Sequence, residues 1–159
     1  MPVLHIQLLG EFNLVYDETL VTSINTTRLR SLLAYLVLHR DAPHSRQQLA
    51  FLFWSDSSES QARTNLRNLI HLLRQSLPEA DQFLCLDSAT IQWRASSPFT
   101  LDVIKFENAI AQDALEQAVE LYRGDLLPDC YGDWILSERE RLQQAQIYRL
   151  DERAGELQR

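Results

Sequence analysis

The feature that most constrains the fold is a regular apolar pattern within residues 58–77, SESQARTNLRNLIHLLRQSL. Its apolar residues recur at the i, i+4, i+7, i+8 spacing of an amphipathic helix, which predicts one buried face. They are Ala62, Leu66, Leu69, Ile70, Leu73 and Leu77. Ser58 or Ser60 can cap the start of this helix, and Pro78 ends it. The polar face is rich in arginine, which serves equally well to keep a surface helix soluble and to bind a nucleic acid.

The segments before this helix predict strands followed by two shorter helices. Residues 3–16 alternate apolar and polar positions around Gly10, which is typical of two strands or of one bent strand, and residues 20–24 favour a further short strand. A helix is expected over 26–40, with Thr26 or Thr27 as its N-cap. A second is expected over 46–54, where Ser45 and Gln48 resemble a capping box.

The segments after the long helix predict a hairpin and then a change of character. Residues 83–87 and 90–95 read as two strands joined by a short turn. Beyond Pro98, the patterns over 102–123 and 134–157 favour helices with acidic outer faces. We therefore expect an α+β chain with two domains, residues 1–97 and 98–159. In the first, a short turn between the second and third helices indicates a helix-turn-helix with the hairpin as its wing.

The distribution of charge supports a basic surface within an acidic chain. The formal net charge is −7, yet residues 28–74 hold seven arginines against three acidic residues, a net charge of +4. Residues 99–159 hold seven Lys or Arg against thirteen acidic residues, a net charge of −6. The acidic second part thus masks a basic block that suits phosphate or guanine contacts.

Several functional classes lack their sequence signatures. The sequence has no apolar run of about 18 residues and no secretory leader, which predicts a cytoplasmic protein without a membrane partner. Cys85 and Cys130 are far apart and lack metal-ligand spacing, and the four glycines form no phosphate-binding loop. We expect no enzymatic activity, no cofactor and no metal.

Residues 62–77 resemble the recognition helix of OmpR-type winged-helix domains, and residues 45–54 resemble the helix that precedes it. Residues 121–142, LYRGDLLPDCYGDWILSERERL, are similar to the start of the bacterial transcriptional activator domain found in regulators of the SARP class. The resemblance implies an OmpR-like winged helix-turn-helix with an N-terminal antiparallel sheet and a C-terminal wing hairpin. It also implies an all-α, tetratricopeptide-like helix pair after it. The family's helical domain is several times longer, so the chain is expected to be a fragment of a larger protein.

The resemblance predicts a bacterial transcriptional regulator, an activator, that reads the major groove of double-stranded DNA with helix 61–77. The base-edge candidates are Arg63, Thr64, Arg67 and Asn68, because arginine fits guanine, asparagine fits adenine and the threonine methyl fits thymine. The phosphate candidates are Arg28, Arg46, His71, Arg74 and Arg94. Arg74 is alternatively expected to fix the wing by an ion pair. The acidic helical part is expected to contact RNA polymerase, another partner or a second subunit in a homodimer.

Two other interpretations remain open at the level of sequence. A winged helix with a modest positive charge can also be a protein-interaction module. The chain can alternatively be the regulatory head of a larger ATPase regulator. The salt dependence of DNA affinity separates the first alternative from DNA binding, because phosphate neutralisation releases counterions.

Overall fold

The computed structural model describes the backbone of residues 2–157 and the side chains of residues 2–147. The chain divides into two compact units, residues 21–98 and residues 2–20 together with 99–157. The first unit ends at Pro98. The N-terminal strands, however, group with the helical segment rather than with the long amphipathic helix.

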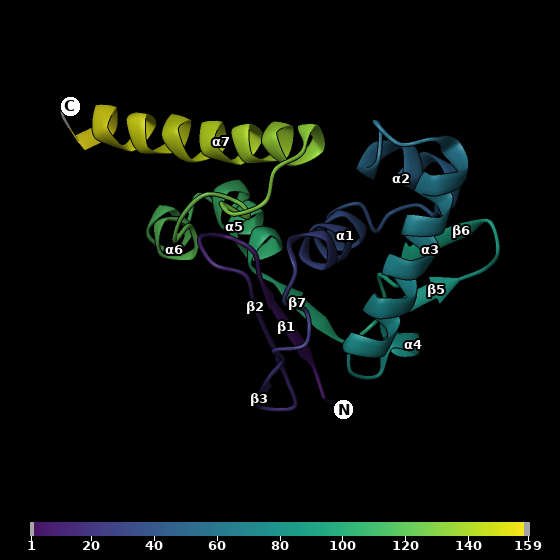
Figure 1. Ribbon diagram of the computed structural model, residues 1–159. Coiled ribbons are helices and arrows are strands. Elements are labelled where there is room, and N and C mark those ends of the chain that lie inside the picture. Colours follow the sequence, from purple (N-terminus) through teal and green to yellow (C-terminus); the bar gives the residue numbers. More distant parts are fainter. Residues whose placement is uncertain (1, 158–159) are drawn as a thin grey trace. The chain divides into compact units, whose positions relative to one another are not determined.

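The first unit contains helices and a small antiparallel sheet (Figure 1). In chain order its elements are α1 (Thr27–Leu38), β4 (His44–Ser45), α2 (Arg46–Phe53), α3 (Glu59–Ser76), α4 (Ala80–Phe83), β5 (Leu84–Leu86) and β6 (Thr90–Trp93). The helix α3 contacts α1, α2 and α4, with α2 near its N-terminal end and α4 at its C-terminal end (Figure 1). The strand β6 pairs with both β5 and β4, so the predicted hairpin gains a third strand.

Side-chain caps set the starts of α1, α2 and α3, as the sequence predicts. The hydroxyl of Thr26 accepts a hydrogen bond from the amide of Leu29, at 3.2 Å. Ser45 caps α2 in the same way. Ser58, rather than Ser60, caps α3 by accepting from the amide of Gln61 at 3.2 Å. Each cap gives an otherwise unpaired N–H of the first turn a partner.

The core of the first unit contains the whole predicted apolar face of α3. The six residues of the stripe, Ala62, Leu66, Leu69, Ile70, Leu73 and Leu77, are all buried. Phe83 stacks on Trp93 at 5.4 Å between ring centroids, and both rings are fully buried. On α2 the buried positions are Leu49 and Ala50, whereas Leu52 is 39% exposed.

The second unit joins a sheet to three helices. Its elements are β1 (Leu4–Gln7), β2 (Asn13–Tyr16), β3 (Thr19–Leu20), β7 (Phe99–Leu101), α5 (Asp102–Ala111), α6 (Leu115–Leu121) and α7 (Asp133–Leu157). The strand order is β3-β2-β1-β7. The expected N-terminal antiparallel sheet is therefore a mixed sheet, since β7 pairs with β1 in parallel. Of the segment 20–24, expected as a strand, only Leu20 belongs to β3.

Contacts between β1 and the segment after residue 98 explain the grouping of the N-terminal strands. The carboxylate of Asp102, the first residue of α5, accepts hydrogen bonds from the amides of Leu8 at 3.0 Å and Leu9 at 2.8 Å. The amide of Leu127 donates to the carbonyl of Leu8 at 3.0 Å. These bonds satisfy backbone groups just beyond β1 with partners more than ninety residues away in sequence.

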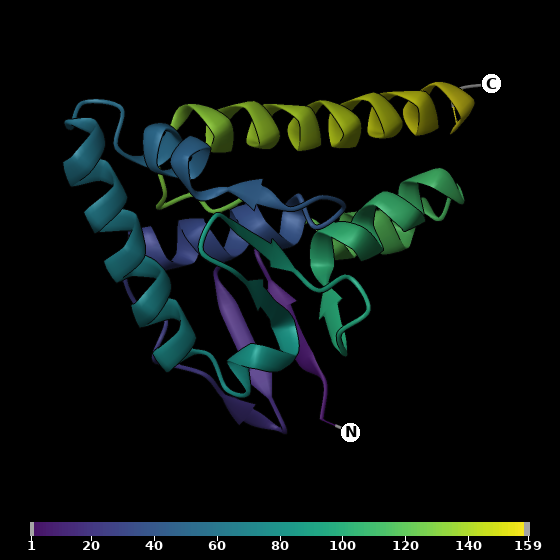
Figure 2. The same ribbon diagram turned by 90° about the vertical axis from the view of Figure 1, so that its right-hand side faces the viewer.

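The helical part differs from the expected pair. Residues 102–123 form two helices, α5 and α6, because Asp113 adopts a left-handed conformation, with φ of 60°, between them. The helix α7 is continuous from residue 133 to 157, and Figures 1 and 2 show it lying across α5 and α6. In the described residues 2–157, no helix combines the length and apolar character that crossing a membrane requires.

Candidate nucleic-acid interface

The solvent-facing side of α3 carries the candidate base-edge residues. Arg63, Arg67 and Asn68 are exposed and Thr64 is half-buried, while the opposite side of the helix is buried in the first unit. At about 1.5 Å per residue, the 18 residues of α3 extend about 27 Å, and the N-terminal part of the helix holds all four candidates. The fold therefore brings these four side chains to one exposed helix surface.

The four side chains differ in how they are engaged. Arg67 and Asn68 make no hydrogen bond or ion pair with any residue of the described part of the chain. Arg63 forms an ion pair with Glu59 one turn earlier, at 2.7 Å. The hydroxyl of Thr64 donates to the carbonyl of Ser60 at 3.0 Å, which leaves its methyl group as the part available for a thymine contact.

The phosphate candidates differ in whether another residue of the fold already contacts the side chain. His71 is exposed and makes no polar contact within the described residues. Arg28 donates to the carbonyl of Phe53, and its guanidinium lies 4.8 Å from the centre of the Trp54 ring. It therefore binds the C-terminal end of α2. A cation over an indole ring is a favourable contact, so moving Arg28 to a phosphate would give that contact up.

Arg74 and Arg94 are both engaged by α4. The guanidinium of Arg74 donates two hydrogen bonds to the carboxylate of Asp81, at 3.0 and 3.2 Å. The Nε of Arg94 donates to the carbonyl of the same residue at 3.3 Å. The ion pair expected of Arg74 thus exists, but its partner lies on α4, which directly precedes β5 of the hairpin.

Arg46 lies where the hairpin meets the start of α2. Its backbone amide donates to the carbonyl of Ala89 at 2.9 Å, so this amide is not available to a phosphate. Its Nε is buried without a hydrogen-bond partner among the described residues. The neighbouring hairpin turn is fixed by the carboxylate of Asp87, which accepts from the amides of Ala89 and Thr90. These two bonds, followed by the Thr90 hydroxyl, lower the pKa of Asp87.

Sequence reasoning missed a small polar network at the start of α3. One carboxylate oxygen of Glu59 accepts from Gln47 of α2 at 3.1 Å and from Arg63 at 2.7 Å. The i, i+4 spacing of Glu59 and Arg63 could have revealed their pairing, since such pairs share a helix face. Nothing in the sequence indicates that Gln47 joins them.

A groove of about 720 Å³ runs beside this network, between α2 and the start of α3. Its lining includes Phe51, which is 72% exposed, together with Trp54, Ala62 and Arg63. Exposed apolar side chains occur singly on protein surfaces, and they also occur at protein-interaction sites. The first unit therefore presents both a polar helix face and an apolar side chain near it.

Metal ligands and thiol pairs are not assembled in the described structure. Within residues 2–147, no group of three His, Cys, Asp or Glu side chains lies close enough together to hold a metal ion. Asp125 accepts a hydrogen bond from the hydroxyl of Tyr122 at 3.1 Å. Cys85 is exposed, Cys130 is buried, and no disulfide joins them.

Comparison with known proteins identifies a related fold. No protein-family model matches the sequence, and no curated protein matches it. The structure is similar to that of Mycobacterium tuberculosis EmbR, solved in complex with a low-affinity phosphopeptide, with a TM-score of 0.72 and 22% sequence identity. The similarity covers 94% of this chain but only 44% of the EmbR chain. At this identity the comparison establishes the fold, a mixed α and β arrangement that extends over both units.

Proposed function

We propose that the chain is a sequence-specific regulator of transcription that binds double-stranded DNA through α3. The observation that carries the proposal is the pair Arg67 and Asn68, which are exposed on α3 and have no polar partner in the described residues. Sequence-specific recognition in the major groove uses such side chains, since arginine binds guanine and asparagine binds adenine in bidentate fashion. The buried stripe on the other side of α3 gives the reading face a rigid support.

The remaining elements fit a winged helix-turn-helix of the OmpR type. In this proposal α2 and α3 form the helix-turn-helix, and the hairpin β5–β6 is the wing. Contacts with phosphates fix the register of such a domain on the duplex, while base contacts give its specificity. Among the described residues, the side chains of His71 and Arg46 have no competing hydrogen bond or ion pair. Arg28, Arg74 and Arg94 would bind phosphate only by giving up the contacts described above.

The roles proposed for the two parts of the chain, residues 1–97 and 98–159, follow from the resemblance to SARP-type regulators. We propose that residues 1–97 act in DNA binding, with the reading elements within 21–98. Residues 98–159 would begin a tetratricopeptide-like activator domain that contacts RNA polymerase or forms a homodimer in the cytoplasm. The charge of −6 in residues 99–159 disfavours DNA contacts by that part of the chain.

A selection from randomised duplex DNA tests this proposal. The expected result is enrichment of a recurring motif, whose binding weakens steeply with salt. For double-stranded DNA the slope of log K against log salt is about −0.9 for each phosphate neutralised. Failure to enrich any motif, with negligible duplex affinity at low salt, would reject DNA recognition.

A protein-interaction module is the second candidate, and the exposed ring of Phe51 favours it. This ring borders the groove between α2 and α3, where an apolar side chain of a partner could cover it. Binding of that kind would depend only weakly on salt. Substitution of Phe51 by Ser would then abolish partner binding and leave duplex affinity unchanged.

A further inference from the structure

The carboxylate of Glu59 is the centre of the network at the start of α3. The same oxygen, Oε1, accepts from Nε2 of Gln47 and from an N–H of Arg63. Glu59 therefore connects α2 to the reading face of α3. Arg67, one turn further along, has no equivalent partner within the described residues, so the two arginines of this face are held differently.

This ion pair is poorly placed to stabilise the fold. The side chains of Arg63 and Glu59 are 61% and 63% exposed, and exposed pairs contribute little to stability because water screens them. A contact of this kind can still orient the guanidinium of Arg63. Because this group is planar and its five N–H donors have fixed directions, holding part of it on Glu59 also fixes the direction of the remaining donors.

We infer that Glu59 is a positioning and specificity-determining residue for Arg63, an inference that rests on the proposed function. An arginine held by Glu59 retains free N–H donors for the two acceptors of guanine, O6 and N7. A phosphate that approached the same guanidinium would meet the negative charge of Glu59 nearby. The pair thus weakens binding to arbitrary DNA more than it weakens binding to a site with guanine opposite Arg63.

The substitution Glu59→Gln tests this role because it keeps the shape of the side chain and removes its charge. Binding is measured by titration of a selected duplex and a scrambled duplex at several salt concentrations. Affinity for the scrambled duplex should rise several-fold, and its salt slope should steepen by about 0.9, the effect of one additional phosphate contact. Affinity for the selected duplex should change less, so the ratio of the two affinities falls.

Asp56→Asn is the matched control. Asp56 is exposed three residues before Glu59, and it makes no hydrogen bond or ion pair with other described residues. This variant changes the net charge equally but does not release Arg63. A second control places Arg63→Ala in the Glu59→Gln protein, where it should remove the gain in affinity for the scrambled duplex.

The outcomes separate this inference from the proposed function. If the unaltered protein selects a motif but Glu59→Gln and Asp56→Asn behave alike, Glu59 does not position Arg63. The inference also fails if Glu59→Gln loses discrimination even when Arg63 is alanine, because Glu59 would then contact a cytosine amino group itself. If the unaltered protein binds no duplex, the proposed function fails and this role of Glu59 fails with it. Unchanged circular dichroism and thermal unfolding would show that the variants fold.

Discussion

The guanidinium of Arg74 and the carboxylate of Asp81 form a two-point ion pair, with N–O distances of 3.0 and 3.2 Å. The pair joins the last turn of α3 to α4, just before the hairpin begins. Both side chains are more than half exposed. An exposed pair of this kind is expected to contribute about 0–1 kcal/mol to the free energy of unfolding.

Arg74→Ala should therefore have a small effect on DNA binding in comparison with Arg67→Ala. Arg74 already has a carboxylate partner, whereas Arg67 has none within the described part of the chain. Titration of a selected duplex with both variants checks the order. A larger loss for Arg74→Ala than for Arg67→Ala would show that Arg74 leaves Asp81 and binds DNA.

Arg139 stabilises the loop before α7, and its removal should destabilise the second unit. Its guanidinium donates to the carbonyls of Leu126, Leu127 and Cys130 at 2.8, 2.5 and 2.9 Å. Leu127 has a φ of 43°, a conformation that a branched side chain adopts only when its surroundings hold it there. Arg139→Ala should lower the free energy of unfolding by about 1.5–3 kcal/mol, measured by urea denaturation.

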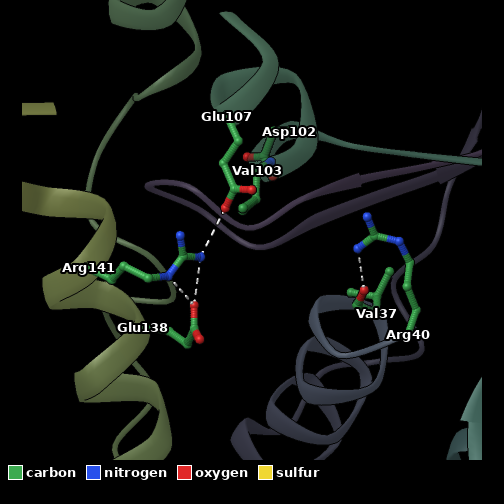
Figure 3. Close-up of polar contacts among 7 residues, drawn as sticks. All are labelled: Val37, Arg40, Asp102, Val103, Glu107, Glu138 and Arg141. Carbon is green, nitrogen blue, oxygen red and sulfur yellow. Dashed lines mark hydrogen bonds and ion pairs between the residues drawn. The ribbon is translucent and has the colours of Figure 1, made fainter. Parts of the chain in front are cut away.

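Arg141 provides the matched control for Arg139. It also lies on α7, but it pairs with the carboxylates of Glu107 and Glu138 at 2.9 and 2.8 Å (Figure 3). Its side chain is 53% exposed, so Arg141→Ala should cost no more than about 1 kcal/mol. Equal losses for the two variants would contradict the special role of the Arg139 loop contacts.

Gly124 lies so close to Gly10 that no larger residue fits. A Cβ atom at position 124 would lie 2.8 Å from the Cα of Gly10, which is a backbone atom and cannot move aside easily. Gly124→Ala should lower the free energy of unfolding by about 1–3 kcal/mol because of this overlap. At Gly132 the nearest atom to an added Cβ is 3.8 Å away, so Gly132→Ala should not show the steric loss. Thermal unfolding of the two variants compares them.

Asp102 should make stability depend on pH. Burial raises the pKa of this carboxyl, although the amides of Leu9, Leu8 and Val103 act in the opposite direction. The unfolded value is about 3.9. As pH falls through the raised folded pKa toward that value, the folded state binds a proton that the unfolded state does not. The contribution of Asp102 to the free energy of unfolding should therefore increase across this window.

Urea denaturation of the unaltered protein and of Asp102→Asn at several pH values measures this contribution. The unfolding free energy of the unaltered protein minus that of Asp102→Asn should increase as pH falls from about 7 toward about 4, the range above the unfolded pKa. A difference that shrinks over this range would mean that the hydrogen bonds from the amides outweigh burial and that the pKa of Asp102 is lowered.

The amphipathic helix and its caps could be predicted because the determining interactions are local. The stripe from Ala62 to Leu77 repeats at helical spacing, and Ser58 is three residues from the amide that it caps. The hairpin was predictable for the same reason, since its strands are separated only by a short turn around Ser88 and Ala89.

The pairing of β7 with β1 could not be predicted, because it joins segments about 95 residues apart. The alternation within residues 3–16 identifies strands but does not identify their partners. The break between α5 and α6 was missed because the apolar pattern continues through Asp113, whose backbone reverses locally. At the candidate site, residue types and spacing predicted which side chains share a face. They did not predict that Arg63 and Arg94 already have partners in the fold, or that the ion-pair partner of Arg74 is Asp81 on α4.

The most direct test of the central claim is the affinity of a selected duplex for the unaltered protein, Arg67→Ala and Gln75→Ala, measured over a range of salt. Gln75 is an exposed residue near the end of the same helix and serves as the control. Arg67→Ala should lose about 1–3 kcal/mol of binding free energy and relax discrimination at one base pair, whereas Gln75→Ala should bind as the unaltered protein does. Equal affinity and equal discrimination for all three proteins would contradict DNA reading by this face of α3.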